Sequence, residues 1–500
     1  MAPCSARTLV IEADWVLPVS GPPIRGGAVR VEGGVIREVG PAPLSGEKVL
    51  SFPGCILLPG LVNAHTHLEY SAFAGFSPPV SFPRWLLRLL LARRKLTAED
   101  WAASALWGAY ECVRNGITSV ADTSSEGRAV ARAARAAGLR ARVYLEVFGL
   151  DDAELPQTMA GLEARLARLR AEFPASGPAG RSQGAPPQAA LLQAGPYLEW
   201  GLSPHAPYTV SARLYRETAR LARRYDLRLA THVAESPAEV EMLRHGRGPI
   251  ARVYQAARLW KGERWRPPGM SPVRYVAETG ALGPQTLVIH AVQVDEADAA
   301  LLGASGAAVA HCPRSNLWLE CGTAPVRLLR EAGVVVGLGT DGLCSNDDFD
   351  MFAEMRTTAA AHGLTAAEVL RMATLEGARA LGWHDQVGSI EPGKRADLVV
   401  VRRKGRQVGV TTGTPRPGAT WTPDSIFDPA REPASGLVSQ VGGALPSDPT
   451  EELVAGASAG DVVMTMVDGM VLFSGGKRLP EVVTGLNRAR ERLGLPPLKD

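Results

Sequence analysis

Residues 59–67 read PGLVNAHTH, and they end an apolar run that begins at Cys55. Residues two apart on a strand point to the same side, so His65 and His67 can face one point beyond the end of this run. Barrel enzymes hold their active sites at that end of their strands. Two imidazoles that face one point suit a metal ion, although a lone H-x-H also fits two polar residues in a loop. The choice between the two depends on what ends the other strands.

Other apolar runs of the chain end on the same kinds of side chain. Four residues stand at or just after the last position of such a run: His232, His290, His311 and Asp341. A fifth, His205, lies just beyond the run Leu198–Leu202. Burial in the core explains any single histidine, but it does not explain this shared position. Imidazole nitrogen and carboxylate oxygen are ligands for zinc, iron or manganese, and three or four of them leave an open position for catalysis. The pattern favours a catalytic metal site.

One carboxylate, Glu235, stands three residues after His232. A bound divalent ion lowers the pKa of its water from about 15.7 towards 7, which supplies hydroxide at neutral pH. From its position Glu235 can move a proton between that water and a substrate atom. The alternative is that Glu235 complements the dipole of the helix that Ser236-Pro237 begins. We favour the catalytic role because Glu235 stands so close to a candidate ligand.

The order of the expected elements indicates an α/β barrel with a second, smaller domain. Residues 8–57 alternate short β-rich runs with Gly/Pro turns, and the β-rich signal returns at Ala396–Val401 and Val462–Phe473. Between them, apolar strands alternate with helical stretches over roughly 330 residues, a length that suits eight strand–helix units. We therefore expect a (β/α)8 barrel at 59–389, a composite domain made of 1–58 and 390–477, and a helix or tail at 478–500.

Three segments interrupt this order. Residues 174–188 and about 403–450 are rich in Gly, Pro and small polar residues, so both are predicted to be long surface insertions. The segment Arg244–Pro272 contains Trp260 and Trp265 and follows a strand end. It is expected either to cover the barrel mouth as a lid or to be an ordinary surface loop packed by its own tryptophans.

The composition points to a small-molecule partner. The 500 residues are 46% hydrophobic and 21% charged, and the net charge of +3 is spread without a Lys/Arg block, so we expect neither nucleic acid nor a membrane as a partner. The apolar run Trp85–Leu91 is far short of the roughly 20 residues of a membrane span and predicts an amphipathic helix. The N-terminus shows no signal-peptide pattern, so we expect a cytoplasmic location. Six dispersed cysteines indicate neither disulfides nor a structural zinc site.

Five motifs resemble the amidohydrolase superfamily, and together they point to its aminohydrolase and chlorohydrolase branch. In chain order they are PGLVNAHTH at 59–67, SPHAPY at 203–208, HCPRSN at 311–316, GTDG at 339–342 with Ser345-Asn346, and GSIEPGKRADL at 388–398. The resemblance covers residues 8–475 in the expected order. It implies a distorted (β/α)8 TIM barrel with a small composite β-sandwich domain built from both chain ends.

The resemblance also implies a role for each candidate side chain. One divalent ion, zinc in the first place and iron or manganese otherwise, would be held by His65, His67, His232 and Asp341. A single ion is implied because no lysine stands in the fourth-strand region to bridge two metals. Asp341 would also act as a base, Glu235 as the proton shuttle, and His290 as the group that orients the leaving-group side of the substrate. His205 would contact the substrate. The resemblance leaves a homodimer open.

Members of this branch mostly replace an exocyclic amine of a nitrogen heterocycle by oxygen, so deamination is the reaction we expect. Three other enzyme classes stay open: a chlorohydrolase, an amide-cleaving hydrolase, and a deaminase of cytosine-type or guanine-type bases. A non-catalytic binding protein that keeps the fold is a further alternative. The zinc deaminases that pair H-x-E with P-C-x-x-C have a different fold, and that pair of motifs is missing from this chain.

The substrate prediction depends on the segment after the first barrel strand. Residues 203–209 resemble S-adenosylhomocysteine/methylthioadenosine deaminases, in which an acidic residue on the helix after the first strand binds ribose hydroxyls. Counted from Trp85, that place is taken by Arg94. This departure argues against a simple adenosine substrate.

Arginines in the same segment favour a substrate that carries an anion, because guanidinium groups bind carboxylates bidentately. Arg88, Arg93 and Arg94 are the candidates, with the alternative that they form a solvated basic helix end. The runs HLEYS at 67–71 and Phe82–Trp85 resemble aminodeoxyfutalosine deaminases of menaquinone biosynthesis, whose substrate is an adenine nucleoside that carries a benzoate. We therefore expect an adenine-nucleoside-type substrate such as aminodeoxyfutalosine, bound by His205, Trp85, Glu69 and Arg94.

Overall fold

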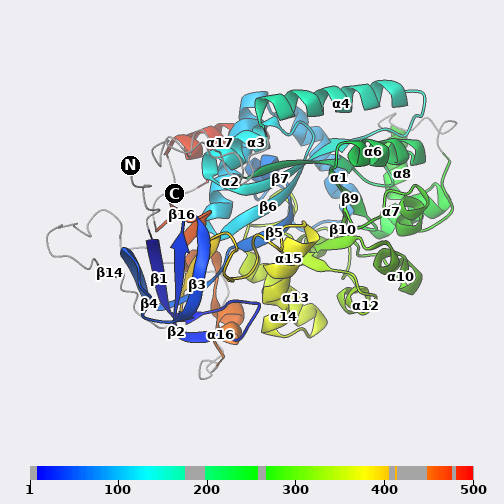
Figure 1. Ribbon diagram of the computed structural model, residues 1–500. Helices are drawn as coiled ribbons and strands as arrows, with labels where there is room; N and C mark the ends of the chain where they lie inside the picture. Colours follow the sequence, from blue (N-terminus) through cyan, green and yellow to red (C-terminus); the bar gives the residue numbers. More distant parts are fainter. Residues whose placement is uncertain are drawn as a thin grey trace.

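The computed structural model describes residues 8–174, 197–256, 266–404, 411–413, 448–475 and 480–498. Within them the chain forms a parallel eight-stranded barrel surrounded by helices, and a separate eight-stranded sheet lies beside it (Figure 1). The expected α/β barrel with a smaller part built from both chain ends is confirmed.

The barrel strands follow one another around the barrel in sequence order, each parallel to the next. Nearly all of their residues are buried, because parallel strands of this kind are covered on both faces. This burial accounts for the continuous apolar runs in the sequence. The strands are β5 (Leu61–Thr66), β6 (Ile117–Ser124), β7 (Arg140–Val147), β8 (Leu198–Pro204), β9 (Arg228–Val233), β10 (Thr286–His290), β11 (Ala308–His311) and β12 (Val336–Leu338).

Helices surround the barrel, and their ends follow local sequence signals. Thr97 caps the start of α2, because its hydroxyl accepts a hydrogen bond from the Asp100 backbone N–H; Gly138, with φ of 78°, ends α3. The helices of this part are α1 (Phe82–Ala92), α2 (Ala98–Arg114), α3 (Arg128–Ala137), α4 (Leu155–Glu172), α6 (Ala212–Arg224), α7 (Pro237–His245), α8 (Pro249–Ala256), α9 (Pro272–Glu278), α10 (Glu296–Ser305), α11 (Pro313–Trp318), α12 (Val326–Glu331), α13 (Met351–His362), α14 (Ala366–Met372) and α15 (Leu375–Ala380), with the short 3-10 helices η1 (Leu68–Phe73) and η2 (Arg93–Lys95).

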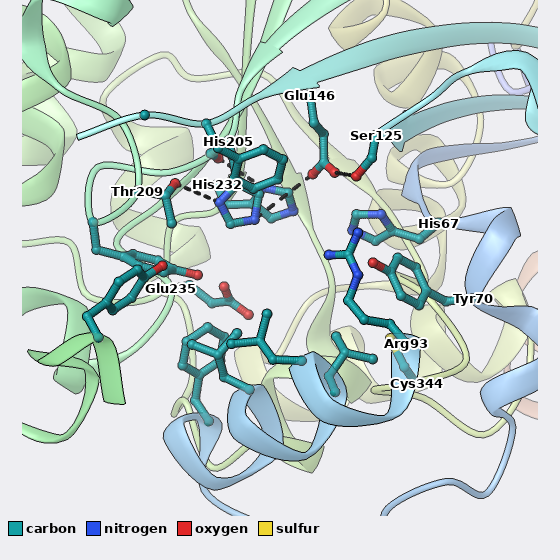
Figure 2. Close-up of a pocket in the computed structure, with 18 of the residues that line it drawn as sticks. His67, Tyr70, Arg93, Ser125, Glu146, His205, Thr209, His232, Glu235 and Cys344 are labelled. Atoms are coloured by element: carbon teal, nitrogen blue, oxygen red, sulfur yellow. Dashed lines mark hydrogen bonds and ion pairs between the residues drawn. The ribbon is translucent and has the colours of Figure 1, made fainter. Parts of the chain in front are cut away.

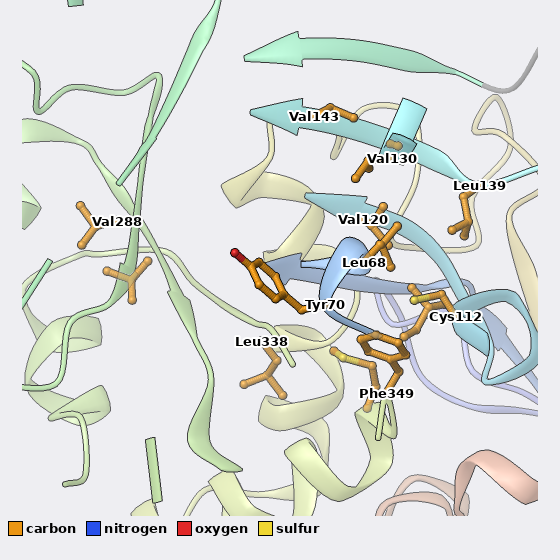
Figure 3. Packing of buried hydrophobic residues seen from close by; sticks show 14 of the residues in the cluster. Leu68, Tyr70, Cys112, Val120, Val130, Leu139, Val143, Val288, Leu338 and Phe349 are labelled. Carbon is orange, nitrogen blue, oxygen red and sulfur yellow. The ribbon is translucent and has the colours of Figure 1, made fainter. Parts of the chain in front are cut away.

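Apolar side chains join the strands to the helices. Val120 of β6 and Val143 of β7 belong to the same buried cluster as Val130 of α3 (Figure 3). The alternate strand residues, such as Ala121 and Ala230, belong to a second cluster that fills the barrel interior. The polar strand ends therefore stand on a rigid, densely packed support.

Hydrogen bonds between the first and the last strand regions close the barrel. Asn63 Nδ2–H donates to Thr340 Oγ1 (2.7 Å), and the Thr340 backbone N–H donates to Asn63 Oδ1 (3.0 Å). The backbone N–H groups of Thr340 and Asp341 both donate to the His65 carbonyl, each at 3.1 Å. Closure thus brings His65 and Asp341, 276 positions apart in the sequence, to the same edge of the barrel.

The second sheet combines both ends of the chain. Antiparallel pairing of β13 with β4 joins Leu398 to Pro59 and so links the two segments. The strand order is β16-β15-β13-β4-β1-β2-β3, with β14 also paired to β4. The bounds are β1 (Thr8–Val16), β2 (Ile24–Glu32), β3 (Val35–Pro41), β4 (Lys48–Pro59), β13 (Leu398–Arg402), β14 (Thr411–Gly413), β15 (Val462–Val467) and β16 (Met470–Phe473); α16 (Pro449–Gly456) and η5 (Ala459–Asp461) precede β15.

The segments that interrupt the barrel are described only in part. Most of 174–188, most of 403–450, and both Trp260 and Trp265 lie outside the described residues. Helix α17 (Pro480–Leu493) stands in the segment where a helix or tail was expected. No described helix is both long and apolar enough to cross a membrane.

A buried ion network fastens the second sheet to the barrel. Arg140 of β7 donates to both carboxylate oxygens of Asp397 (3.0 and 3.3 Å) and to Asp468 Oδ1 (3.1 Å). Only 1% of the Arg140 and Asp397 side chains is exposed. Removing one partner leaves a buried charge without its counterion, which is far more costly than removing an exposed pair.

Asp397→Ala is therefore expected to destabilise the folded protein by about 3–5 kcal/mol, measured by equilibrium unfolding in urea. The matched control is Glu217→Ala, which removes the exposed Arg220–Glu217 pair (2.6 Å) and should cost less than about 1 kcal/mol. Equal losses in the two variants would contradict this account of the network.

Candidate metal-dependent active site

A cavity of about 740 Å³ opens at the carboxyl ends of the barrel strands (Figure 2). Its buried end is lined by His67, His232, Glu235, His290 and Asp341, and its wall includes residues of α1, of α8 and of the loop after β7. The volume lies within the range of roughly 300–1,000 Å³ that is usual for small-molecule sites.

Three histidines and one aspartate converge at the buried end. His65 Nε2 lies 3.3 Å and His67 Nε2 lies 3.6 Å from Asp341 Oδ1. The ring of His232 lies 5.0 Å from the ring of His65, centroid to centroid. The candidate ligand atoms of His65, His67 and Asp341 lie within 4.8 Å of one another, as do those of His65, His232 and His290. These spacings allow one small cation to contact several of them.

Hydrogen bonds orient the rings of this cluster. The Nδ1 of His67 lies 2.8 Å from the Thr123 carbonyl, and the Nδ1 of His232 lies 3.1 Å from the His205 carbonyl. Each Nδ1 therefore carries the proton and donates it, which leaves the lone pair on Nε2 for a metal. His65 is 1% exposed, and neither of its ring nitrogens has a hydrogen-bond partner. A buried nitrogen of this kind requires a ligand, so the donor set fits a divalent metal ion.

Asp341 is held in place by three hydrogen bonds. Its Oδ2 accepts from the hydroxyls of Ser315 and Ser345 (both 2.7 Å), and its Oδ1 accepts from the Gly342 backbone N–H (2.8 Å). Burial by itself would raise the pKa of Asp341, but the adjacent imidazole of His65 and the charges of neighbouring histidines lower it well below its usual value. Asp341 is therefore a carboxylate at neutral pH.

Glu235 and His290 form an acid–imidazole pair beside the cluster. Glu235 Oε1 lies 3.5 Å from His290 Nε2, and His290 Nδ1–H donates to Asn316 Oδ1 (2.9 Å). Burial raises the pKa of Glu235 well above its usual value, and the charges of Asp341 and Glu239 raise it further. Burial lowers the pKa of His290 to about 4. Burial thus favours the protonated form of Glu235 and the uncharged form of His290.

Strained backbone carries these groups. Ala234, His290 and Asp341 have positive φ values of 55°, 73° and 59°. Such conformations cost about 1–3 kcal/mol for residues other than glycine and persist where the surroundings hold them, which is common at functional sites. One such restraint is visible at the first of them: the carboxylate of Glu239 accepts from the backbone N–H groups of Ala234 (3.0 Å) and Glu235 (2.8 Å).

Two of the four expected substrate-binding residues line the cavity. His205 follows β8, and Thr209 Oγ1 lies 2.8 Å from its Nδ1. Trp85 of α1 donates its indole N–H to the Cys344 carbonyl (2.7 Å), which fixes the ring in the cavity wall. Within Arg244–Pro272, Tyr254 of α8 lines the cavity, so part of this segment stands at the barrel mouth.

The other two expected residues are placed differently. Glu69 is buried, and its carboxylate accepts from Ser124 Oγ (2.7 Å) and the Ser125 backbone N–H (3.4 Å), so it is engaged within the protein. Arg94 is exposed, whereas the preceding residue, Arg93, lines the cavity. Arg88 donates to Ser77 Oγ (3.3 Å). The arginine that can meet a substrate anion is therefore Arg93 instead of Arg94.

One buried acidic residue of the cavity, Glu146, is not among the candidates found in the sequence. Glu146 lies near the end of β7 and faces the cavity together with Ser125 (Figure 2). The candidates in the sequence are polar groups at or beyond strand ends, whereas Glu146 stands one residue before the end of β7. The signal that could have found it is a glutamate within an otherwise apolar strand run, one residue before the last position.

The chain matches known proteins over most of its length. A family model described as "Amidohydrolase family" matches residues 56–472. A 5-methylthioadenosine/S-adenosylhomocysteine deaminase of Syntrophobacter fumaroxidans is 34% identical over 397 residues, which cover 75% of this chain and 80% of the relative. A 5'-deoxyadenosine deaminase of Methanothermobacter thermautotrophicus is 34% identical over 409 residues, which cover 80% and 85% of the two chains.

A solved structure agrees with this likeness. An adenosine deaminase of Xanthomonas campestris with bound zinc has a TM-score of 0.73 and 26% sequence identity, and the match covers 98% of this chain and 99% of that one.

Close packing at Gly339 yields a test of the site geometry. A Cβ at this position would lie 2.9 Å from both the backbone nitrogen and the carbonyl oxygen of His65, and 3.0 Å from Cys312 Sγ. Gly339→Ala is therefore expected to displace His65 from Asp341, and to lower both the melting temperature and the zinc content after reconstitution, measured by thermal melting and elemental analysis. Gly161→Ala, on the exposed face of α4 where nothing lies within 4 Å, should lower neither, because alanine favours a helix more than glycine does. Full zinc content in Gly339→Ala would refute the dependence of the site on this contact.

Proposed function

The chain belongs to the amidohydrolase family, and on that premise we propose that it is a metal-dependent deaminase that hydrolyses the exocyclic C–N bond of an adenine nucleoside. The observation that carries the proposal is the meeting of His65, His67 and Asp341 with a protonated Glu235 at the end of one cavity. The relatives named as deaminases of methylthioadenosine, S-adenosylhomocysteine and 5'-deoxyadenosine support this substrate class.

Four side chains would hold the ion: a ring nitrogen of His65, Nε2 of His67, Nε2 of His232 and Oδ1 of Asp341. When bound, a divalent ion at this place supplies hydroxide at neutral pH. Nitrogen and oxygen donors of this kind accept zinc, iron or manganese. The zinc in the adenosine deaminase of Xanthomonas campestris supports zinc as the first choice.

The remaining residues divide the proton transfers between them. Asp341, a carboxylate of low pKa, accepts the proton of the attacking water. Glu235 retains its proton because its pKa is raised, and it donates this proton to the ring nitrogen next to the reacting carbon. The uncharged His290 faces Glu235 through Nε2 and would orient the leaving amine. Asp341 would pass the water proton on to the exocyclic nitrogen, so that it leaves as ammonia, and the added hydroxyl would return its proton to Glu235. Two carboxyl groups with pKa values moved in opposite directions thus supply the base and the acid.

The cavity wall favours a nucleoside whose substituent combines an apolar ring with an anionic group. Leu86, Leu89 and Leu90 of α1 line it together with Trp85 and offer an apolar surface for an aromatic ring. Arg93, at the end of the same helix, extends into the cavity (Figure 2). A benzoate could lie against the leucines with its carboxylate on Arg93, because guanidinium binds carboxylate bidentately. Aminodeoxyfutalosine is the adenine nucleoside we propose on this ground.

Glu235→Gln tests the proton donor. The amide keeps the shape of the side chain but cannot donate an acidic proton, so deamination should fall at least about 100-fold while the metal content stays the same. The decrease in absorbance of the adenine ring, together with ammonia release, measures the rate. Glu241→Gln, at a partly exposed position of α7 that pairs with Arg247, is the control and should keep full activity. A Glu235→Gln variant as active as the control would exclude the proposed role.

Arg93→Ala tests the substituent. For aminodeoxyfutalosine, kcat/KM should fall about 10- to 100-fold, because a charge-assisted hydrogen-bonded pair is lost. For 5'-methylthioadenosine, which lacks the carboxylate, it should stay unchanged. The neighbouring exposed variant Arg94→Ala should affect neither substrate. A preference of the unmodified enzyme for methylthioadenosine would rule out aminodeoxyfutalosine as the substrate.

A further inference from the structure

Glu146 is a buried acidic side chain of the cavity that the proposed proton transfers do not use. Only 5% of Glu146 is exposed, and it stands near the end of β7 among the residues that line the cavity. Its Oε2 accepts a hydrogen bond from Ser125 Oγ (3.2 Å). Its Oε1 lies 4.0 Å from Nε2 of His205, which is beyond hydrogen-bond distance. Figure 2 shows Glu146 and His205 facing each other across the cavity wall.

The hydrogen bonds around His205 show that, within the described residues, Glu146 and His205 lack a proton donor between them. Thr209 donates its only hydroxyl proton to the Ala206 carbonyl (3.0 Å), so it must accept from His205 Nδ1–H at 2.8 Å. The other ring nitrogen, Nε2, is then left as an acceptor. The oxygen Oε1 of Glu146 is an acceptor as well. Two acceptors 4.0 Å apart in a buried wall require a ligand that brings protons to both of them.

The guanidinium of Arg165 does not supply these protons. Arg165 makes its hydrogen bonds to backbone carbonyls, those of Ser125 and Glu146, the latter at 2.6 Å. The carboxylate of Glu146 thus keeps an acceptor oxygen on the cavity side.

A second metal ion is a poorer occupant than a hydroxylated ligand. The candidate ligand atoms of Glu146, His205 and His232 lie within 4.8 Å of one another. His232, however, donates its Nδ1 proton to the His205 carbonyl, and its Nε2 belongs to the first cluster. A second ion would therefore have only Glu146 and His205 as ligands, fewer than the three or four protein ligands usual for such ions.

We infer that Glu146 and His205 bind the two neighbouring hydroxyls of the substrate's ribose, one hydroxyl proton going to Oε1 of Glu146 and the other to Nε2 of His205. The position supports it: the His205 ring lies 4.9 Å from that of His232, so a sugar attached to a base at the metal centre lies beside this pair. Glu146 is then the specificity residue that makes the enzyme prefer ribonucleosides. The inference rests on the proposed nucleoside deaminase function.

The experiment compares adenosine with 2',3'-dideoxyadenosine as substrates of the zinc-reconstituted full chain. The unmodified enzyme should favour adenosine by about 1,000-fold or more in kcat/KM, because a site that hydrogen-bonds a hydroxyl strongly rejects the analogue without it. In Glu146→Ala, kcat/KM for adenosine should fall about 100-fold, and that for the dideoxy analogue should change less than about 3-fold. The isosteric Glu146→Gln, which keeps the side-chain shape, should show the same loss of preference to a smaller degree.

The controls separate this inference from the proposed function and from a structural role of Glu146. Metal content and melting temperature should be unchanged in both variants, and Glu217→Gln, on the exposed face of α6, should retain the full preference. Equal losses for both substrates would mean that Glu146 only supports the site and would overturn the inference. An unchanged preference in both variants would overturn it as well while leaving deamination intact. Failure of the unmodified enzyme to deaminate either nucleoside, with aminodeoxyfutalosine and methylthioadenosine also inert, would overturn the proposed function and the inference together.

Discussion

The approach of β12 to β5 is the contact on which the rest of the site depends. One carbonyl, that of His65, accepts hydrogen bonds from the backbones of Thr340 and Asp341. Gly339 allows it, since a methyl group there would collide with His65. The same closure that completes the barrel therefore sets the distance of 3.3 Å between His65 and the Asp341 carboxylate. Fold and metal centre share one set of hydrogen bonds, so the site cannot form before the barrel closes.

Different neighbours then give the two buried carboxyl groups opposite pKa shifts. The adjacent imidazole of His65 and the charges of His67 and His290 outweigh burial and lower the pKa of Asp341. For Glu235, burial raises the pKa, and the charges of Asp341 and Glu239 raise it further. Because a hydrolytic deamination needs both a base and an acid, this division suits the reaction. The difference between the two pKa shifts follows from where Asp341 and Glu235 stand in the barrel, and not from one being an aspartate and the other a glutamate.

The strand ends could be predicted from the sequence, but the cavity wall only in part, since Trp85 and His205 line it and Arg94 and Glu69 do not. An apolar run followed by histidine or aspartate is a local pattern, and parallel strands bring such ends to one edge. The direction in which a side chain on a short helix points cannot be predicted from such a local pattern. Arg93 and Arg94 stand in a 3-10 turn, where neighbours diverge by about 120°, so counting from Trp85 could not decide which one faces the cavity. Glu69 resembles a site residue in the sequence, but Ser124, 55 positions later, binds its carboxylate.

Anomalous diffraction at the zinc absorption edge, from crystals of the zinc-reconstituted protein, tests the central claim most directly. The account predicts one peak at roughly 2.0–2.2 Å from a ring nitrogen of each of three histidines, His65, His67 and His232, and from an oxygen of Asp341. A peak held by other side chains, or a structure in which these four groups surround no ion at full zinc saturation, would contradict it.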